Sequence, residues 1–188
     1  MGHLFNASRA MGQAVIMYGL GQNGSNFLNT AAGELAQTGV SALTVHANSA
    51  RRIAEAWQAR SGEIASFFHG SIQQAQGSAE ANPLPYHTAS AGWLFGMAIA
   101  SSENFEKDTL LSKIDEIAAT LDEAKKHIIA YADKSGPQAN TLRSLGNNID
   151  GHIKKVKGLT TARDPDGQVR ESAKITRALS EQVSTMMQ

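Results

Sequence analysis

Apolar residues recur along this chain at intervals of three and four positions, the spacing that brings side chains to one face of an α-helix. The most regular series steps alternately by four and three, and its members are Leu110, Ile114, Ile117, Leu121, Ala124, Ile128 and Tyr131. A second series follows Ser135-Gly136-Pro137 and consists of Leu142, Leu145, Ile149, Val156 and Leu159, with His152 at its vacant inward position. Two stripes joined by so short a connection predict an antiparallel helical hairpin.

A longer stripe lies between residues 44 and 76, where Ile53, Trp57, Ile64, Phe68 and Ala75 follow at steps of four, seven, four and seven. This eleven-residue repeat predicts a long central helix with a nearly straight apolar face. Gly62 and Gly70 interrupt it, and because each costs about 1 kcal/mol relative to alanine, we expect the helix to bend there. The large residues Ile53, Trp57, Ile64 and Phe68 are candidate interaction residues.

Proline marks the clearest boundary, in the stretch EANPLPYHT. Pro83 and Pro85 each lack an amide donor and bias the preceding residue towards an extended conformation. We therefore predict a hinge at 83–90 between an N-terminal region, 1–82, and a C-terminal region, 91–188, that together form one cooperative unit. A last break at TTARDPDGQVRE precedes a final helix from about Gln168 to Met187, for which Asp166 is the candidate cap.

Two segments are more apolar than their neighbours: MGQAVIMYGLG near the start and AGWLFGMAIA at 91–100. No Asp, Glu, Lys or Arg lies between Arg9 and Glu34 or between Glu80 and Glu103. A core helix buried on most sides has this composition. A surface that enters a partner groove or a membrane interface, with Trp93 and Phe95 as anchors, has it too. The lack of lysine on a polar face favours the partner over the membrane.

Composition agrees with helices, because alanine is abundant and the Val-rich runs typical of buried parallel strands are scarce. The sequence thus predicts an all-α fold: a helical bundle with one long central helix and a C-terminal antiparallel helical hairpin. Lys plus Arg equals Asp plus Glu at 17 each, so nucleic-acid binding is not expected. The chain has no cysteine, which excludes disulfides and zinc-thiolate sites. We find no signal peptide and no span of about 20 apolar residues, so we expect a cytoplasmic protein or export without a cleaved signal.

One motif suggests an enzyme. Gly19, Gly21 and Gly24 spell G-x-G-x-x-G after the apolar run AVIMY. A dinucleotide-binding loop needs a strand before it, a helix after it and an acidic residue about 20 positions on. AVIMY, SNFLNTAAGELAQ and ALTVHAN could supply strand, helix and second strand, but Arg51 and Arg52 stand where the acid is expected, which favours NADP.

The stretch GLGQNGSN…ALTVHANSARR resembles the opening of the NADP-dependent 3-hydroxyacid dehydrogenases over roughly a fifth of the chain. The resemblance implies an oxidoreductase that holds its nucleotide at Gly19, Gly21, Gly24 and Arg51. The match stops there, since no third Val- and Ile-rich strand and no lysine-bearing catalytic helix follow. The competing interpretation is a GQNGS turn between two helices.

Other chemistry finds little support. DPDGQVRE contains the D-x-D-G of a calcium loop, but Ala162 and Ala173 occupy its two end ligand positions. The histidines are scattered, and no catalytic motif is present, so we expect no catalytic residue, cofactor or metal. The leading hypothesis is a non-enzymatic assembly or interaction protein that binds protein partners or itself through helix seams. The composition is compatible with a subunit of a secretion, conjugation or virion-delivery complex. The alternatives are the NADP-dependent oxidoreductase and a membrane-active helical protein that inserts 91–100.

Overall fold

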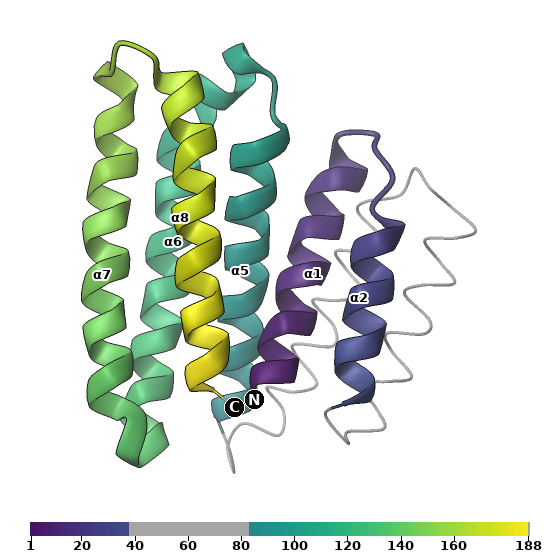
Figure 1. The fold of residues 1–188 in the computed structure, drawn as a ribbon, viewed down its shortest axis with the longest axis vertical. Coiled ribbons are helices and arrows are strands. Elements are labelled where there is room, and N and C mark those ends of the chain that lie inside the picture. The colour runs from purple at the N-terminus through teal and green to yellow at the C-terminus, as the bar shows by residue number, and fades with distance from the viewer. Residues whose placement is uncertain (38–82, 188) are drawn as a thin grey trace.

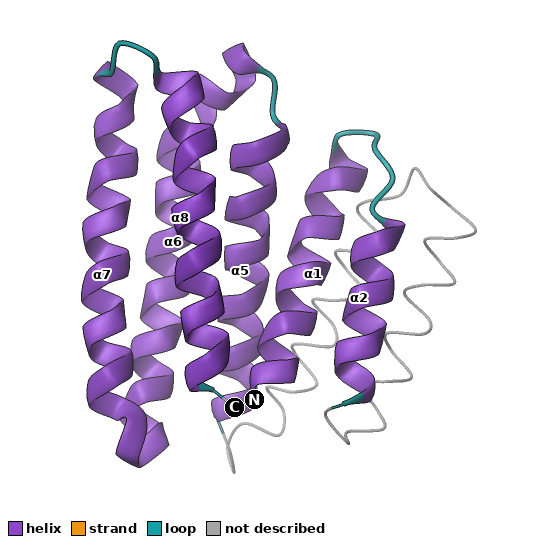
Figure 2. Cartoon of the chain, viewed as in Figure 1, coloured by secondary structure: helices purple, strands orange, loops and turns teal. Residues whose placement is uncertain are grey.

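The computed structural model describes residues 1–37 and 83–187, and every regular element in these ranges is helical (Figures 1 and 2). The elements are α1 (Gly2–Gly19), α2 (Ser25–Ala36), α5 (Leu84–Asn104), α6 (Lys107–Ser135), the 3-10 turn η1 (Gly136–Gln138), α7 (Ala139–Gly158), the 3-10 turn η2 (Leu159–Thr161) and α8 (Pro165–Met186). The all-α prediction is confirmed for these residues. The predicted central helix at 44–76, with Ile53, Trp57, Ile64 and Phe68, lies outside the described residues.

Helices α5, α6, α7 and α8 form an up-down-up-down bundle, which Figure 1 shows from teal through green to yellow. The predicted hairpin is its α6–α7 pair, and it turns at Gly136, whose φ of 72° suits glycine. Every member of the α6 series is buried, as are all members of the α7 series except the half-buried Leu159. The heptad seam of the hairpin is therefore buried inside one chain, in a core that α5 and α8 share.

Helix α5 begins in the segment that the prolines led us to predict as a hinge. Pro83 is the residue before the helix and Pro85 lies in its first turn, so residues 84–90 are helical. The first amides of a helix have no intrahelical acceptor, so prolines cost little there. Leu84, which precedes Pro85, is therefore helical and not extended, while the hinge at 83–90 and the division into regions at 82 and 91 stay predictions.

Helix α8 begins three residues before the predicted start. Asp164, and not the predicted Asp166, is the cap, and its carboxylate accepts a hydrogen bond of 3.4 Å from the amide of Gly167. Pro165 then occupies the first helical position. An acidic cap followed by proline is a favourable start for a helix.

Helices α1 and α5 run parallel and pack backbone against backbone. A Cβ added to Gly92 would lie 2.5 Å from the Phe5 carbonyl oxygen, and one added to Gly96 or Gly12 would overlap the carbonyl of Arg9 or Trp93. We call Gly12, Gly92 and Gly96 the glycine seam. It allows α1 to lie on the outer side of the bundle, where α2 then packs against α1 (Figure 1).

Candidate functional site

The glycine motif Gly19-x-Gly21-x-x-Gly24 joins two helices. The run AVIMY is the last part of α1, so the strand that a dinucleotide loop requires is replaced by a helix. Gly21 has a φ of 72°, its amide donates to the Tyr18 carbonyl at 3.0 Å, and the Gln22 amide donates to the Met17 carbonyl at 2.9 Å. This is the Schellman arrangement that ends helices at glycine.

The last glycine of the motif serves packing. A Cβ on Gly24 would approach the Ala14 carbonyl oxygen and the Tyr18 ring to 3.0 Å, so glycine lets α2 start close to α1. Arg51, the predicted phosphate ligand, lies outside the described residues. The spacing of the motif is therefore explained by a helix end and a close approach, and the predicted strand at AVIMY is wrong.

The two predicted anchors in α5 have different environments. Phe95 is fully buried and meets the Phe5 ring edge-to-face, with 6.0 Å between ring centroids. Trp93 is half-buried and packs beside Ala10 and Met11 of α1. Phe95 is therefore a core residue, and only Trp93 keeps a partly exposed ring. Among the described helices, none is both long and apolar enough to cross a membrane.

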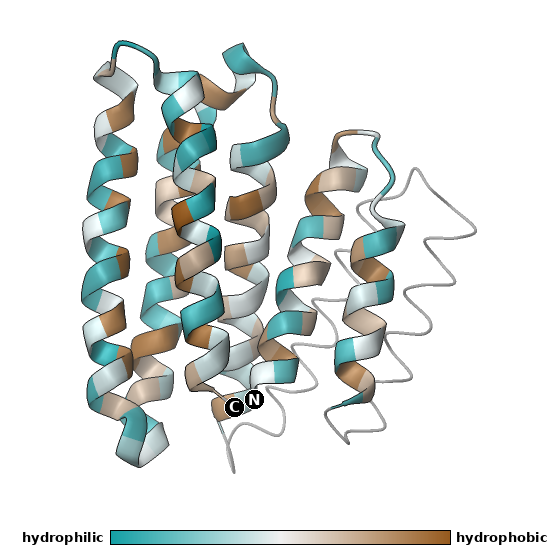
Figure 3. Cartoon of the chain, in the orientation of Figure 1, coloured by the Kyte–Doolittle hydropathy of each residue, from teal (hydrophilic) through white to brown (hydrophobic). Residues whose placement is uncertain are grey.

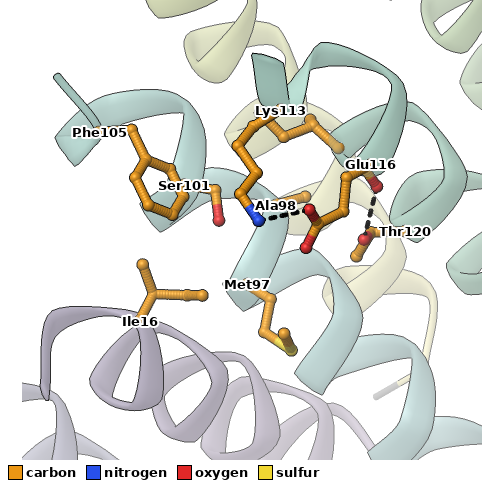
Figure 4. Close-up of a pocket in the computed structure, with 9 residues that line it drawn as sticks. Ile16, Met97, Ala98, Ser101, Phe105, Lys113, Glu116 and Thr120 are labelled. Carbon is orange, nitrogen blue, oxygen red and sulfur yellow. Dashed lines mark hydrogen bonds and ion pairs between the residues drawn. The ribbon is translucent and has the colours of Figure 1, made fainter. Parts of the chain in front are cut away.

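A small cleft opens where α1, α5 and α6 meet (Figure 4). Ile16 reaches it from α1, Met97, Ala98 and Ser101 line it from α5, Phe105 closes one side, and Lys113, Glu116, Ile117 and Thr120 line it from α6. We call it the α1 cleft. Its volume of about 40 Å³ holds a few waters or the tip of one apolar side chain, far below the ~300 Å³ at which ligand pockets begin.

An ion pair forms the polar rim of the α1 cleft. Lys113 Nζ lies 2.6 Å from Glu116 Oε2, and the same ammonium group is 5.9 Å from the centre of the Phe105 ring. Phe105 is held in place from α8, because Arg170 donates to the carbonyls of Glu103 and Phe105 at 2.5 Å each. The cleft thus combines an apolar floor with a rim on which the charges of Lys113 and Glu116 are paired.

Partly exposed apolar side chains extend beyond the cleft on α1 and its neighbours. They are Val15, Ile16, Met17, Leu20, Phe27, Trp93, Leu94 and Met97. The same region carries few charges, because no Asp, Glu, Lys or Arg lies between Arg9 and Glu34. Figure 3 shows hydrophobic and hydrophilic positions alternating along α7 and α8 as well as along α1. Ile16 and Met97 lie in the two apolar segments that the sequence marked, but the sequence did not bring them together, and it missed Phe105, because only the packing of α1 on α5 forms this junction.

Two histidines from different helices meet at the opposite end of α5. His87, in the first turn of α5, and His127 of α6 face each other with 3.0 Å between their Nδ1 atoms. Tyr86 packs against both, with its ring centre 5.3 Å from His87 and 5.5 Å from His127. Burial lowers the pKa of both imidazoles, and His87 lowers that of His127 further. We call His87 and His127 the histidine pair.

A third histidine is part of the core. His152 is 5% exposed, and its Nε2 lies 2.9 Å from the Thr176 hydroxyl, which itself donates to the Ser172 carbonyl at 3.1 Å. The hydroxyl therefore accepts from His152 Nε2–H. Burial, and then Lys155, lower the pKa of His152. The vacant step of the α7 stripe is thus filled by a hydrogen-bonded imidazole.

Within the described residues, neither the histidine pair nor His152 has enough neighbouring ligands to form a metal centre. No three His, Cys, Asp or Glu side chains in 1–37 and 83–187 converge on a point where a metal ion could sit. Protein-bound zinc takes three or four protein ligands, and the histidine pair offers two. No protein-family model, curated protein or solved structure matches this chain.

Proposed function

We propose that this chain is a non-enzymatic helical interaction protein that binds a second copy of itself or a helical partner through the apolar surface around the α1 cleft. The observation that carries the proposal is the gathering of partly exposed Ile16, Met97 and Phe105 at one junction of three helices. Buried aromatic and aliphatic anchors in small clefts are the usual centres of binding energy in interfaces.

The helix seams favour this surface over the others. The apolar residues of the α6 and α7 stripes are buried in the core of the bundle, so these helices have no apolar face left for an intermolecular coiled coil. Ile175 on α8 is 49% exposed, but its neighbours Lys174 and Arg177 are charged and exposed. Isolated apolar residues of this kind are ordinary on protein surfaces, whereas contiguous ones mark interaction sites.

A partner helix fits the dimensions of the α1 cleft. The space takes one side-chain tip, and the partly exposed Ile16, Met97 and Phe105 that line it give an apolar contact for a residue of a second helix. Membership in a secretion, conjugation or virion-delivery complex rests on composition alone and is the less specific part of the proposal.

Sedimentation velocity over a range of concentrations tests the proposal, with crosslinked capture from the native source run in parallel. We expect association or capture by the wild-type chain, and its loss in Ile16→Glu, because a carboxylate cannot be buried unpaired in an apolar contact. Ile175→Glu is the matched control, since it makes the same exchange on α8 and should retain both. The proposal would be refuted if the wild-type chain stays monomeric and captures only proteins that the Ile16→Glu variant captures as well.

A further inference from the structure

We propose that the histidine pair is an acid-sensitive latch, which holds the start of α5 on α6 at neutral pH and releases it when both imidazoles carry a proton. The 3.0 Å approach of His87 Nδ1 to His127 Nδ1 requires that one ring donates and the other accepts. At neutral pH two imidazoles of opposite tautomer satisfy this requirement. The bond joins the first turn of α5 to a point near the end of α6.

Protons act on the pair in two steps. The first proton makes one imidazolium, whose Nδ1–H still donates to the neutral partner, so the bond between α5 and α6 persists. The second proton removes the remaining acceptor, because both Nδ1 atoms then carry hydrogen, and it places two like charges 3.0 Å apart in a half-buried site. We infer that local parting of the two helices relieves this repulsion.

The groups around the histidine pair do not relieve the repulsion between two protonated rings. Tyr86 packs on both rings, and Tyr131, one turn beyond His127, has a pKa raised by burial, so the Tyr131 phenol remains neutral in acid. Glu123, one turn before His127, favours one cation, but it also pairs with Lys126 at 2.9 Å. No charge described on α1, α7 or α8 contributes to the pKa of either imidazole.

The direction in which pH changes the stability of the fold follows from the lowered pKa values of the two imidazoles. An unfolded histidine has a pKa of about 6.5, so the unfolded chain takes up protons before the folded one does. The stabilisation by the pair is complete above that value and is lost as the pH falls through the lower folded values. Because the pair lies in the first turn of α5, we expect opening there before the bundle unfolds as a whole.

Amide hydrogen exchange of the full chain at about pH 7 and about pH 5 tests the latch, with rates corrected for the intrinsic effect of pH. In the wild type we expect amides near residues 87–92 and 124–131 to lose about tenfold or more of their protection at the lower pH. Amides in the middle of α7 should keep theirs. In His127→Asn the loss of protection should be much smaller than in the wild type, because asparagine offers donor and acceptor close to the Nδ1 position and does not titrate, so no second like charge forms beside His87.

Three variants distinguish the latch from general acid sensitivity. Since opening needs the second proton, His87→Asn should behave as His127→Asn does, and the double variant should add nothing. His152→Gln removes a buried histidine elsewhere and should leave the local loss of protection intact. Equal loss along the whole bundle, or the same local loss in either asparagine variant, would overturn the proposal.

Discussion

The α6–α7 hairpin and the α1–α5 pair hold together by opposite means. In the hairpin, large apolar side chains fill the space between helices, and ion pairs such as Lys125–Asp150 at 2.9 Å link the outer sides. Between α1 and α5 the glycine seam removes side chains so that the backbones touch, and the buried Ser8 Oγ and Gln13 Nε2 have no partner within the described residues. Removing volume should therefore damage the first pair, and adding volume should damage the second.

The largest effect is expected from truncating the hairpin core. Leu121 of α6 is 1% exposed and belongs to the main core cluster. Leu121→Ala should lower the free energy of unfolding by about 2–5 kcal/mol, because it removes apolar contact and leaves a cavity. Urea titration followed by circular dichroism measures it. Ile175→Ala on the exposed side of α8 should change stability by less than about 0.5 kcal/mol, and an equal loss in both variants would contradict the assigned core.

The inverse experiment applies to the glycine seam. Gly96→Ala should cost about 1–3 kcal/mol, because its methyl group would overlap the Arg9 carbonyl and neither backbone can yield without moving a helix. Gly151→Ala on α7 is the matched control, since nothing lies within 4 Å of its Cβ position. That variant should gain about 0.5–1 kcal/mol from helix propensity. If both substitutions stabilise the protein, α1 does not pack on α5 as described.

Hydrogen bonding gives the next contrast. Thr176→Val should cost about 1–3 kcal/mol, because it leaves the buried Nε2–H of His152 without an acceptor. Ser8→Ala in the α1–α5 contact should be neutral or slightly stabilising, since the lost hydroxyl makes no bond. Thermal and urea unfolding of both variants provide the comparison. A large loss in Ser8→Ala would mean that its hydroxyl has a partner, such as bound water.

The same contrast explains what could be predicted from the sequence. The stripes from Leu110 to Leu159 have helical period and large residues, so they determine two helices and their antiparallel contact without further information. The contact of α1 with α5 depends on Gly12, Gly92 and Gly96, which lie in two apolar segments whose composition also fits a partner-binding surface. Nothing local distinguishes these uses, because the close approach exists only between residues some 80 positions apart.

The candidate sites follow the same rule. The sequence allowed Trp93 and Phe95 to be either core residues or anchors for a partner, and only the packing decides: Phe95 is fully buried in the main core cluster beside Phe5 of α1. His87 and His127 lie 40 positions apart and share no motif. A buried histidine at the vacant step of a regular stripe, as at His152, was the one local signal of a polar contact inside the core.

The smallest effect is expected at the ion pairs on the hairpin surface. Hydrogen bonds from Lys125 hold the pKa of Asp122 and Asp150 below its ordinary value. A lowered carboxyl pKa contributes stability above the unfolded value of about 3.9, and the contribution is lost as the pH falls through the folded values. Because these carboxylates are solvent-exposed, Asp150→Asn should cause only a slight loss at neutral pH. The loss should shrink as the pH falls below about 3.9 and in about 1 M salt, whereas the loss in Leu121→Ala should persist in both conditions. The urea midpoints of both variants, measured at each pH and salt concentration, test this difference. A salt-independent loss of stability in Asp150→Asn would show that the carboxylate acts by packing and not by charge.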